Sequence, residues 1–194
     1  MHRALPLFAL LVSFAALAAA PASPHRHHGP HVHGEATLNV GLDGQLLLVS
    51  LDAPGMSLLG FEHPPRDDAE RAAYRATLDA LNAPGGWLLL PQAAGCALES
   101  VQVAPHGFDA ADGDGHGDDD HDHDDDAHGG DHEHADFDAT YRYACHAPLA
   151  LHALDVTLFE RFPPLHKVNV DLVLPDRQGS QVLTPGTTMV PLSK

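Results

Sequence analysis

Residues 35–51 read EATLNVGLDGQLLLVSL and carry the pattern of a β-hairpin. Apolar and polar side chains alternate as far as Leu42, as they do in a strand with one buried face. Asp43-Gly44 is the strongest short-range signal for a hairpin turn. The run after this turn is more continuously apolar, so we expect both faces of the second strand to be covered. The hairpin predicts a β-sheet at the centre of the fold.

Further strand patterns and one helix pattern follow the hairpin. Alternation predicts strands over residues 96–103, 137–145, 168–174 and 181–183. A helix is expected over about 67–82, where Asp67 and Glu70 form a capping box. Residues from Pro185 onward are interpreted as a tail. The prediction is a mostly β or α+β fold, with a compact antiparallel sheet and one main helix.

A long acidic segment interrupts the strand pattern. Residues 107–138 read GFDAADGDGHGDDDHDHDDDAHGGDHEHADFD, with fourteen Asp or Glu and no Lys or Arg from Asp109 to Asp138. This segment has too little apolar surface to offset the entropy cost of ordering it. We therefore expect a disordered insertion. A solvating linker is the alternative, but solvation alone needs no histidine. Imidazoles and carboxylates bind divalent cations, and the candidate ligands here are His116, His121, His123 and His128.

Charge and the N-terminal residues limit the classes of function. The net charge of −17 argues against nucleic acid and anionic membranes as partners, and it favours cations. A basic start, an apolar run and small residues predict a Sec-type signal peptide over residues 1–22, with no membrane insertion after cleavage. We then expect a flexible His-rich segment over 23–34 and a β-rich metal-binding domain over 35–192, interrupted by a loop over 106–134.

Cys96 and Cys145 are the two cysteines of the chain. An even cysteine count in an exported protein indicates a disulfide. This bridge would close the span that contains the acidic insertion, which stabilises the fold by roughly 4 kcal/mol in a chain-entropy model. A pair of thiolate metal ligands is the alternative, which an oxidising compartment disfavours.

Two His-x-His motifs each precede a predicted strand. Residues two apart in extended chain point to the same face, so each motif presents two imidazoles together. If the two strands begin at the same end of the sheet, four imidazoles and two carboxylates converge, and zinc needs three or four such ligands. Two flexible chelators that never meet are the alternative. The candidate ligands are His31, His33, Glu35, His132, His134 and Asp136.

Other histidines add to the candidate set. The N-terminal tract contributes His25, His27 and His28. His63 forms with Glu62 either a ligand pair or an acid/base pair, or it orients the loop before Pro64. The chain contains no familiar catalytic motif, so we expect a protein that is not an enzyme. Imidazole suits Zn²⁺, of which we expect several ions per chain, and it also accepts Ni²⁺ or Cu²⁺.

Several motifs together resemble the ZrgA-type periplasmic zinc-binding proteins of Gram-negative bacteria. They are His33-Gly34-Glu35-Ala36, Gly60-Phe61-Glu62-His63 with Arg66, Cys96, the run from His132 to Phe137, Tyr141-x-x-x-Cys145 and the run from Leu158 to Pro163. The resemblance covers nearly all of the chain after the signal peptide. It implies a β-rich domain with His-rich segments that binds zinc and serves a zinc-uptake system.

The expected function is therefore capture of Zn²⁺ in the periplasm by a monomer, with components of an inner-membrane zinc transporter as partners. A passive periplasmic buffer or resistance protein for Ni²⁺ or Cu²⁺, without a transporter partner, is the alternative. A metal-dependent hydrolase that uses Glu62 and His63 is a third hypothesis. The cluster-type receptors of ABC importers also carry acidic His loops, but they need two α/β lobes and a much longer chain.

Overall fold

The structure, a computed structural model, describes residues 32–109 and 134–193. Its strands are β1 (Glu35–Asp43), β2 (Leu46–Pro54), β3 (Leu88–Leu89), β4 (Cys96–His106), β5 (Asp136–Cys145), β6 (Ala153–Val156), β7 (Lys167–Leu174), β8 (Arg177–Leu183) and β9 (Met189–Pro191). Its helices are α1 (Gly55–Leu58), α2 (Asp68–Asn82) and α3 (Leu158–Arg161), with 3-10 turns η1 (Pro84–Gly86), η2 (Gln92–Ala94) and η3 (Pro148–Ala150). The expected mostly β fold with one main helix is confirmed.

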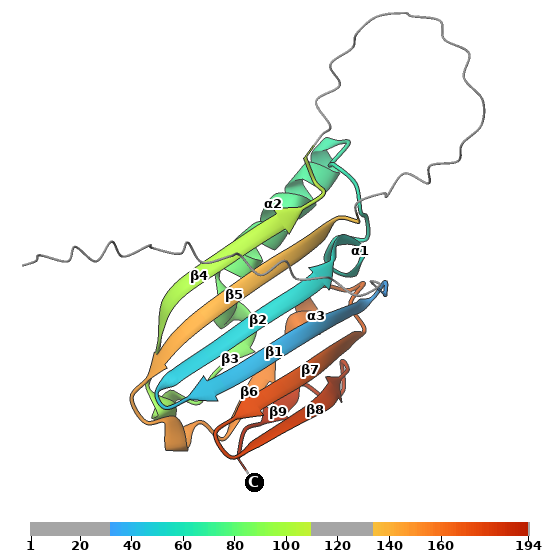
Figure 1. Cartoon of the computed structure of the whole chain (residues 1–194). Coiled ribbons are helices and arrows are strands. Elements are labelled where there is room, and N and C mark those ends of the chain that lie inside the picture. The colour runs from blue at the N-terminus through green and yellow to red at the C-terminus, as the bar shows by residue number, and fades with distance from the viewer. Residues whose placement is uncertain (1–31, 110–133, 194) are drawn as a thin grey trace, which may run out of the picture.

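Six strands form the main sheet in the order β4-β5-β2-β1-β7-β8 (Figure 1). The predicted hairpin is β1 and β2, joined by Gly44 and Gln45, and Gly44 has the positive φ (57°) that such a turn requires. Neighbouring strands are antiparallel except β1 and β7, which are parallel. The sheet is therefore mixed, because the chain crosses over through the second layer before it returns as β7.

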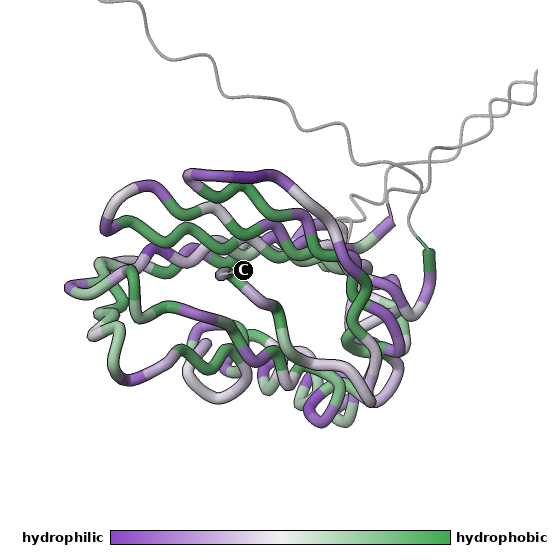
Figure 2. The backbone as a smooth tube through the Cα atoms, turned by 90° about the horizontal axis from the view of Figure 1, so that it is seen from below, coloured by the Kyte–Doolittle hydropathy of each residue, from purple (hydrophilic) through white to green (hydrophobic). Residues whose placement is uncertain are grey.

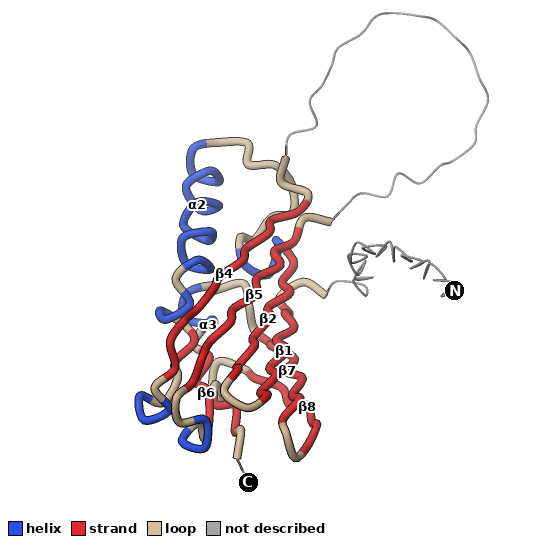
Figure 3. The backbone as a smooth tube through the Cα atoms, turned by 60° about the vertical axis from the view of Figure 1, so that its left-hand side comes forward, coloured by secondary structure: helices blue, strands red, loops and turns tan. Residues whose placement is uncertain are grey.

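The second layer covers one face of this sheet, as the view along the sheet shows (Figure 2). It contains a small sheet in the order β3-β6-β9 together with the helices, and α2 runs beside β4 and β5 (Figure 3). The interpretation of residues after Pro185 as a tail was wrong. Met189–Pro191 pairs with β6, because Val190 and Leu192 bury their side chains in the core.

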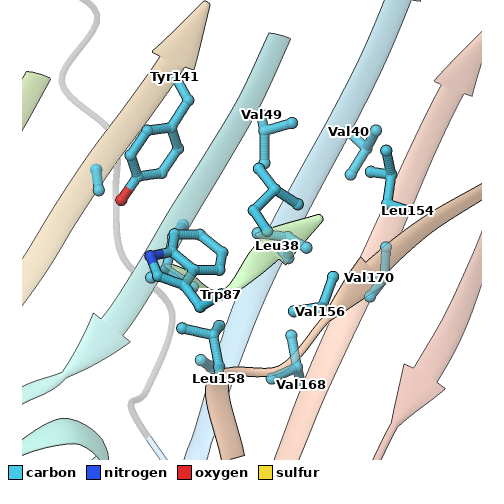
Figure 4. Packing of buried hydrophobic residues seen from close by; sticks show 14 of the residues in the cluster. Leu38, Val40, Val49, Trp87, Tyr141, Leu154, Val156, Leu158, Val168 and Val170 are labelled. Carbon is cyan, nitrogen blue, oxygen red and sulfur yellow. The ribbon is translucent and has the colours of Figure 1, made fainter. Parts of the chain in front are cut away.

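The core lies between the two layers (Figure 4). Trp87 is fully buried, packs edge-on against Tyr141 with ring centroids 5.3 Å apart, and donates from Nε1 to Ala80 O at 3.2 Å. Every second residue of β5 from Phe137 to Cys145 faces this core, as the alternation predicts. Each buried Leu or Val of such a core contributes roughly 1.5–3 kcal/mol relative to an exposed one.

The prediction that both faces of β2 are covered was wrong. Leu47, Val49 and Leu51 are buried, but Leu48 between them is 43% exposed. Successive side chains of a strand point to opposite faces, and within the described part of the chain the second layer covers only one face. A run of consecutive leucines therefore does not distinguish a strand covered on one face from a strand covered on both.

Helix α2 begins and ends where its local signals place it. Asp67 is the N-cap, and its Oδ1 accepts from Glu70 N at 2.8 Å. Glu70 Oε2 in turn accepts from Arg66 N at 2.7 Å, one residue before the cap. The helix stops at Asn82, before Pro84. No helix in residues 32–109 and 134–193 has the length and apolar character needed to cross a bilayer.

A disulfide joins β4 and β5 at one end, and an aromatic contact joins the chain segments at the other end. The predicted disulfide is confirmed, because Cys96 and Cys145 are bonded and lie directly opposite each other in the sheet. This bond excludes the alternative of two thiolate ligands. At the other end, Phe108 packs against Phe137 and against Tyr74 of α2, with ring centroids 4.8 and 5.1 Å apart. The two sides of the acidic insertion are thus joined at its base.

Candidate metal site

The ends of four strands meet at one end of the main sheet. β1 and β5 begin there, and β2 and β4 end there, because β2 is antiparallel to β1 and β5 is antiparallel to both β2 and β4. In Figure 1 these ends lie together beside α1. The condition for the two His-x-His motifs to approach each other, that their strands begin at the same end of the sheet, is therefore met.

The second histidine of each motif contacts the same carboxylate. His33 Nε2 lies 3.3 Å from Glu62 Oε2, and His134 Nδ1 lies 3.4 Å from the same oxygen. Both imidazoles are well exposed, at 58% and 65%, whereas the Glu62 side chain is 11% exposed. We call these three residues the His33–Glu62–His134 cluster. It presents two accessible nitrogen ligands around a carboxylate that is shielded from solvent.

Glu62 and His33 are both fixed by backbone contacts. Glu62 Oε1 accepts from Met56 N at 3.4 Å. His33 is the second residue of a β-turn in which Glu35 N donates to Val32 O at 3.1 Å. Gly34, the third residue, has φ +79°, as in a type II turn, and a Cβ there would overlap the ring of His166. The glycine is therefore required both by the turn and by the close packing.

The three described residues of the cluster do not form a complete metal site. Within residues 32–109 and 134–193, no group of three or more His, Cys, Asp or Glu side chains is placed to hold a metal ion. In the structure the Glu62 oxygen lies between the two imidazoles at the distance of long hydrogen bonds. Binding of a metal ion here therefore requires a rearrangement of these side chains or a further ligand.

The two predicted acidic ligands lie in other surroundings. Glu35 Oε2 pairs with Lys167 Nζ at 2.8 Å and accepts from Asn169 Nδ2 at 3.1 Å, both on β7. The hydrogen bond from Lys167 and then that from Asn169 lower the pKa of Glu35 below its usual value, so this carboxylate stays ionised and paired. Asp136 is 6% exposed and lies opposite Pro54 of β2 and His106 of β4.

His63 belongs to the loop that carries Glu62 but faces different partners. Its ring stacks on Phe61 with centroids 4.9 Å apart, and Nδ1 lies 3.0 Å from Pro64 O. The same nitrogen is 3.9 Å from Glu70 Oε2 on α2. These contacts connect the Glu62 loop to the first turn of α2.

The remaining predicted ligands lie outside the residues that the structure describes. They are His25, His27, His28, His31, His116, His121, His123, His128 and His132. The predicted signal peptide over residues 1–22 and positions 110–133 of the predicted insertion lie outside them as well.

Sequence reasoning missed Glu62 as the residue at which the two motifs meet. The signal that could have found it is local, because Glu62 adjoins a histidine in a proline-rich loop. Because Glu62 is far from both motifs in the sequence, its contacts with His33 and His134 could not be predicted from spacing. His106, which was not among the predicted ligands, ends β4 at the same end of the sheet, and its Nε2 lies 3.7 Å from Asp138 Oδ2 on the neighbouring strand.

Comparison with known families identifies the chain. The family model described as "ZrgA family zinc uptake protein" matches residues 30–192. The chain belongs to the ZrgA family. The match includes all the described strands and each residue of the cluster, and it gives the protein a role related to zinc. No protein with curated information matches the sequence. The resemblance of the motifs to ZrgA proteins is thereby confirmed.

Proposed function

We propose that this ZrgA protein is exported to the periplasm and captures Zn²⁺ there for a zinc-uptake system. The tight site consists of His33, Glu62 and His134, with a further ligand from His31 or His132. The observation that carries the proposal is that His33 and His134, one from each His-x-His motif, contact the same oxygen of Glu62. The histidines of the N-terminal tract and of the insertion bind additional zinc ions more weakly.

Two of the distances within the cluster, from each imidazole to Glu62, have the size expected for zinc ligands. At zinc–ligand distances of about 2.0–2.1 Å, two ligands of a tetrahedral ion lie about 3.3–3.4 Å apart. The two nitrogen-to-oxygen distances, 3.3 and 3.4 Å, have this size. Neutral imidazole and carboxylate are also the common partners of zinc outside thiolate sites. Both cysteines are held in the disulfide, so the imidazoles and carboxylates supply the ligands.

The charge distribution supports a capture role. Fourteen of the 27 acidic residues lie between Asp109 and Asp138, and the ends of this insertion emerge at the same end of the sheet as the cluster. Such a segment raises the local concentration of cations within about a Debye length, roughly 8 Å at physiological salt. In this proposal the insertion binds cations weakly and raises their local concentration, and the cluster binds a zinc ion tightly.

In this proposal the protein acts as a monomer and is not an enzyme, and its partners are components of an inner-membrane zinc transporter. A passive buffer for Ni²⁺ or Cu²⁺ is the competing function. The neighbourhood of the gene distinguishes the two, since transporter and zinc-repressed genes beside it favour uptake, whereas efflux genes favour the buffer. Hydrolytic activity that is lost when Glu62 and His63 are replaced would instead support the third hypothesis, a metal-dependent hydrolase.

Calorimetric titration of the mature protein with Zn²⁺ tests the proposal. We expect several ions per chain, one of them bound more tightly than the rest. Affinity falls as the pH is lowered from about 7.5 to about 5.5, because protons compete with zinc for imidazole. Absence of zinc binding near pH 7 refutes the function, and tighter binding of Ni²⁺ or Cu²⁺ than of Zn²⁺ supports the buffer.

Deletion of residues 110–130 should separate the weak sites from the tight one. The deletion removes His116, His121, His123 and His128 but leaves eight residues between the paired His106 and Asp136, enough for a hairpin loop. We expect lower zinc stoichiometry, one remaining tight site and an unchanged unfolding midpoint, since Phe108, Phe137 and the disulfide stay in place. Loss of the tight site in this variant would place the principal site in the insertion.

A further inference from the structure

Three consecutive residues of α1 contact either Glu62 of the His33–Glu62–His134 cluster or residues directly beside its two histidines. Gly55 N donates to Ala135 O at 2.7 Å, next to His134. Met56 N donates to Glu62 Oε1 at 3.4 Å. Ser57 contacts the two residues that follow His33. α1 follows β2 without an intervening loop, so the main sheet itself holds this single turn in place.

The Ser57 hydroxyl makes the most specific of these contacts. It is fully buried, accepts from Gly34 N at 3.0 Å, and donates to Glu35 O at 2.8 Å. One hydroxyl thus satisfies a donor and an acceptor of the turn that carries His33. Gly34 O accepts in addition from His166 N at 2.9 Å. The backbone on the strand side of His33 is therefore tied to two separate elements, while its imidazole remains exposed.

The contact at Gly55 depends on the absence of a side chain. A Cβ at this position would lie 2.8 Å from Phe61 O and 2.9 Å from Ala135 O. Phe61 precedes Glu62 and Ala135 follows His134, so the glycine permits both ligand-bearing segments to approach α1 closely. The three parts of the cluster come from distant parts of the sequence and share one short element as their support.

We propose that Ser57 is a positioning residue for zinc binding: its buried hydroxyl holds the His33 turn in its binding orientation before the metal arrives. Exposed imidazoles lose conformational freedom when they close on a metal ion, and a backbone that is already ordered reduces this loss. Partners that orient metal ligands typically contribute 10- to 100-fold to affinity. The inference rests on the tight zinc site proposed above and names a residue that does not itself bind the ion.

The test compares Ser57→Ala with Thr77→Val in the full mature chain. Thr77 is also a buried hydroxyl residue, but it lies further along α2 than Glu70, the residue through which this helix contacts His63 beside the cluster. Affinity is measured by competition between the protein and a chromophoric chelator for Zn²⁺, and the ligand geometry by the visible absorption of bound Co²⁺. We expect Ser57→Ala to weaken the tight site about 10- to 100-fold and to alter the Co²⁺ spectrum, with the number of ions unchanged. Thr77→Val should remain within about 2-fold of the wild type.

A second measurement uses the unmodified protein, in case Ser57→Ala does not fold. If the turn is ordered in advance, the Gly34 amide exchanges with solvent at least about 100-fold more slowly than an open amide even without zinc. An amide that is protected only after zinc is added overturns the proposal. Tight wild-type binding that Ser57→Ala leaves unaltered also overturns it, and the proposed function then stands. A wild-type protein without any tight zinc site refutes the proposed function instead.

Discussion

Replacing His31, His33, His132 and His134 with alanine is expected to remove the tight zinc site while sparing the weak sites and the fold. The described pair, His33 and His134, contacts Glu62 through exposed imidazoles, so their loss leaves the core intact. Removal of metal ligands should weaken the tight site by at least about 100-fold, since loss of a supporting partner alone costs 10- to 100-fold. Competition titration with Zn²⁺ measures the affinity, and circular dichroism checks the fold.

A matched control uses histidines beyond the opposite end of β5. His146 and His152 are exposed, and alanine at both positions should leave the tight site within about 2-fold of the wild type. Tight binding that survives the fourfold replacement but disappears on deletion of residues 110–130 would show that the principal site lies in the insertion.

The substitution Glu62→Gln tests whether the shared carboxylate is itself a ligand. The amide keeps the shape of the side chain and can still accept from Met56 N, but it has no charge for the metal. We expect a loss of affinity on the order of 100-fold without a change in the unfolding midpoint. Glu160→Gln, at an exposed position of α3, is the control. Equal zinc affinity of the two variants would exclude Glu62 from the ligand set.

The largest expected effect on stability comes from the disulfide. Cys96 and Cys145 are 49 residues apart in the sequence, and a bridge of this span stabilises a protein by about 4 kcal/mol in the chain-entropy model. The double variant Cys96→Ala/Cys145→Ala should therefore lose about 4 kcal/mol of unfolding free energy. For a domain of this size the loss corresponds to a decrease in Tm on the order of 10 °C. Urea denaturation and calorimetry measure the two quantities.

Reduction of the wild-type protein provides the comparison for this variant. A reducing agent should lower the unfolding midpoint of the wild type to that of the double variant and leave the variant itself unchanged. Zinc affinity at the tight site should be retained in the folded double variant, because the bridge joins β4 and β5 at the end away from the cluster. A midpoint that does not respond to reduction would contradict the assigned stabilising role.

Local features of the sequence account for most of the elements. The hairpin follows from alternation and from Gly44, and α2 follows from its Asp67 cap and the stop before Pro84. The pairing of Cys96 with Cys145 follows from an even cysteine count in a chain that is predicted to be exported. The hairpin and helix signals each act over a few residues, so they can be recognised without knowledge of the neighbouring elements. With only two cysteines in the chain, a single intramolecular pairing is possible.

The arrangement of the sheet and of the cluster depends on contacts between distant residues. Alternation within β1 indicates a strand but contains no information that β7 lies parallel beside it, and this register is what pairs Glu35 with Lys167. The run Leu46-Leu47-Leu48 likewise does not reveal which face the second layer covers. Strand partners and covered faces are chosen by the packing of the whole core, which periodicity along one strand does not encode.

The His-x-His motifs likewise combine a property that the sequence predicts with one that depends on the tertiary structure. Residue type and spacing alone predicted pairs of imidazoles before two strands, and with them a role in metal binding. That His33 and His134 share Glu62, and that Gly55, Met56 and Ser57 support all three, follows only from the tertiary structure. The reason is physical: ligand chemistry belongs to single side chains, whereas a distance of 3.3 or 3.4 Å between distant segments depends on strand order and register throughout the sheet.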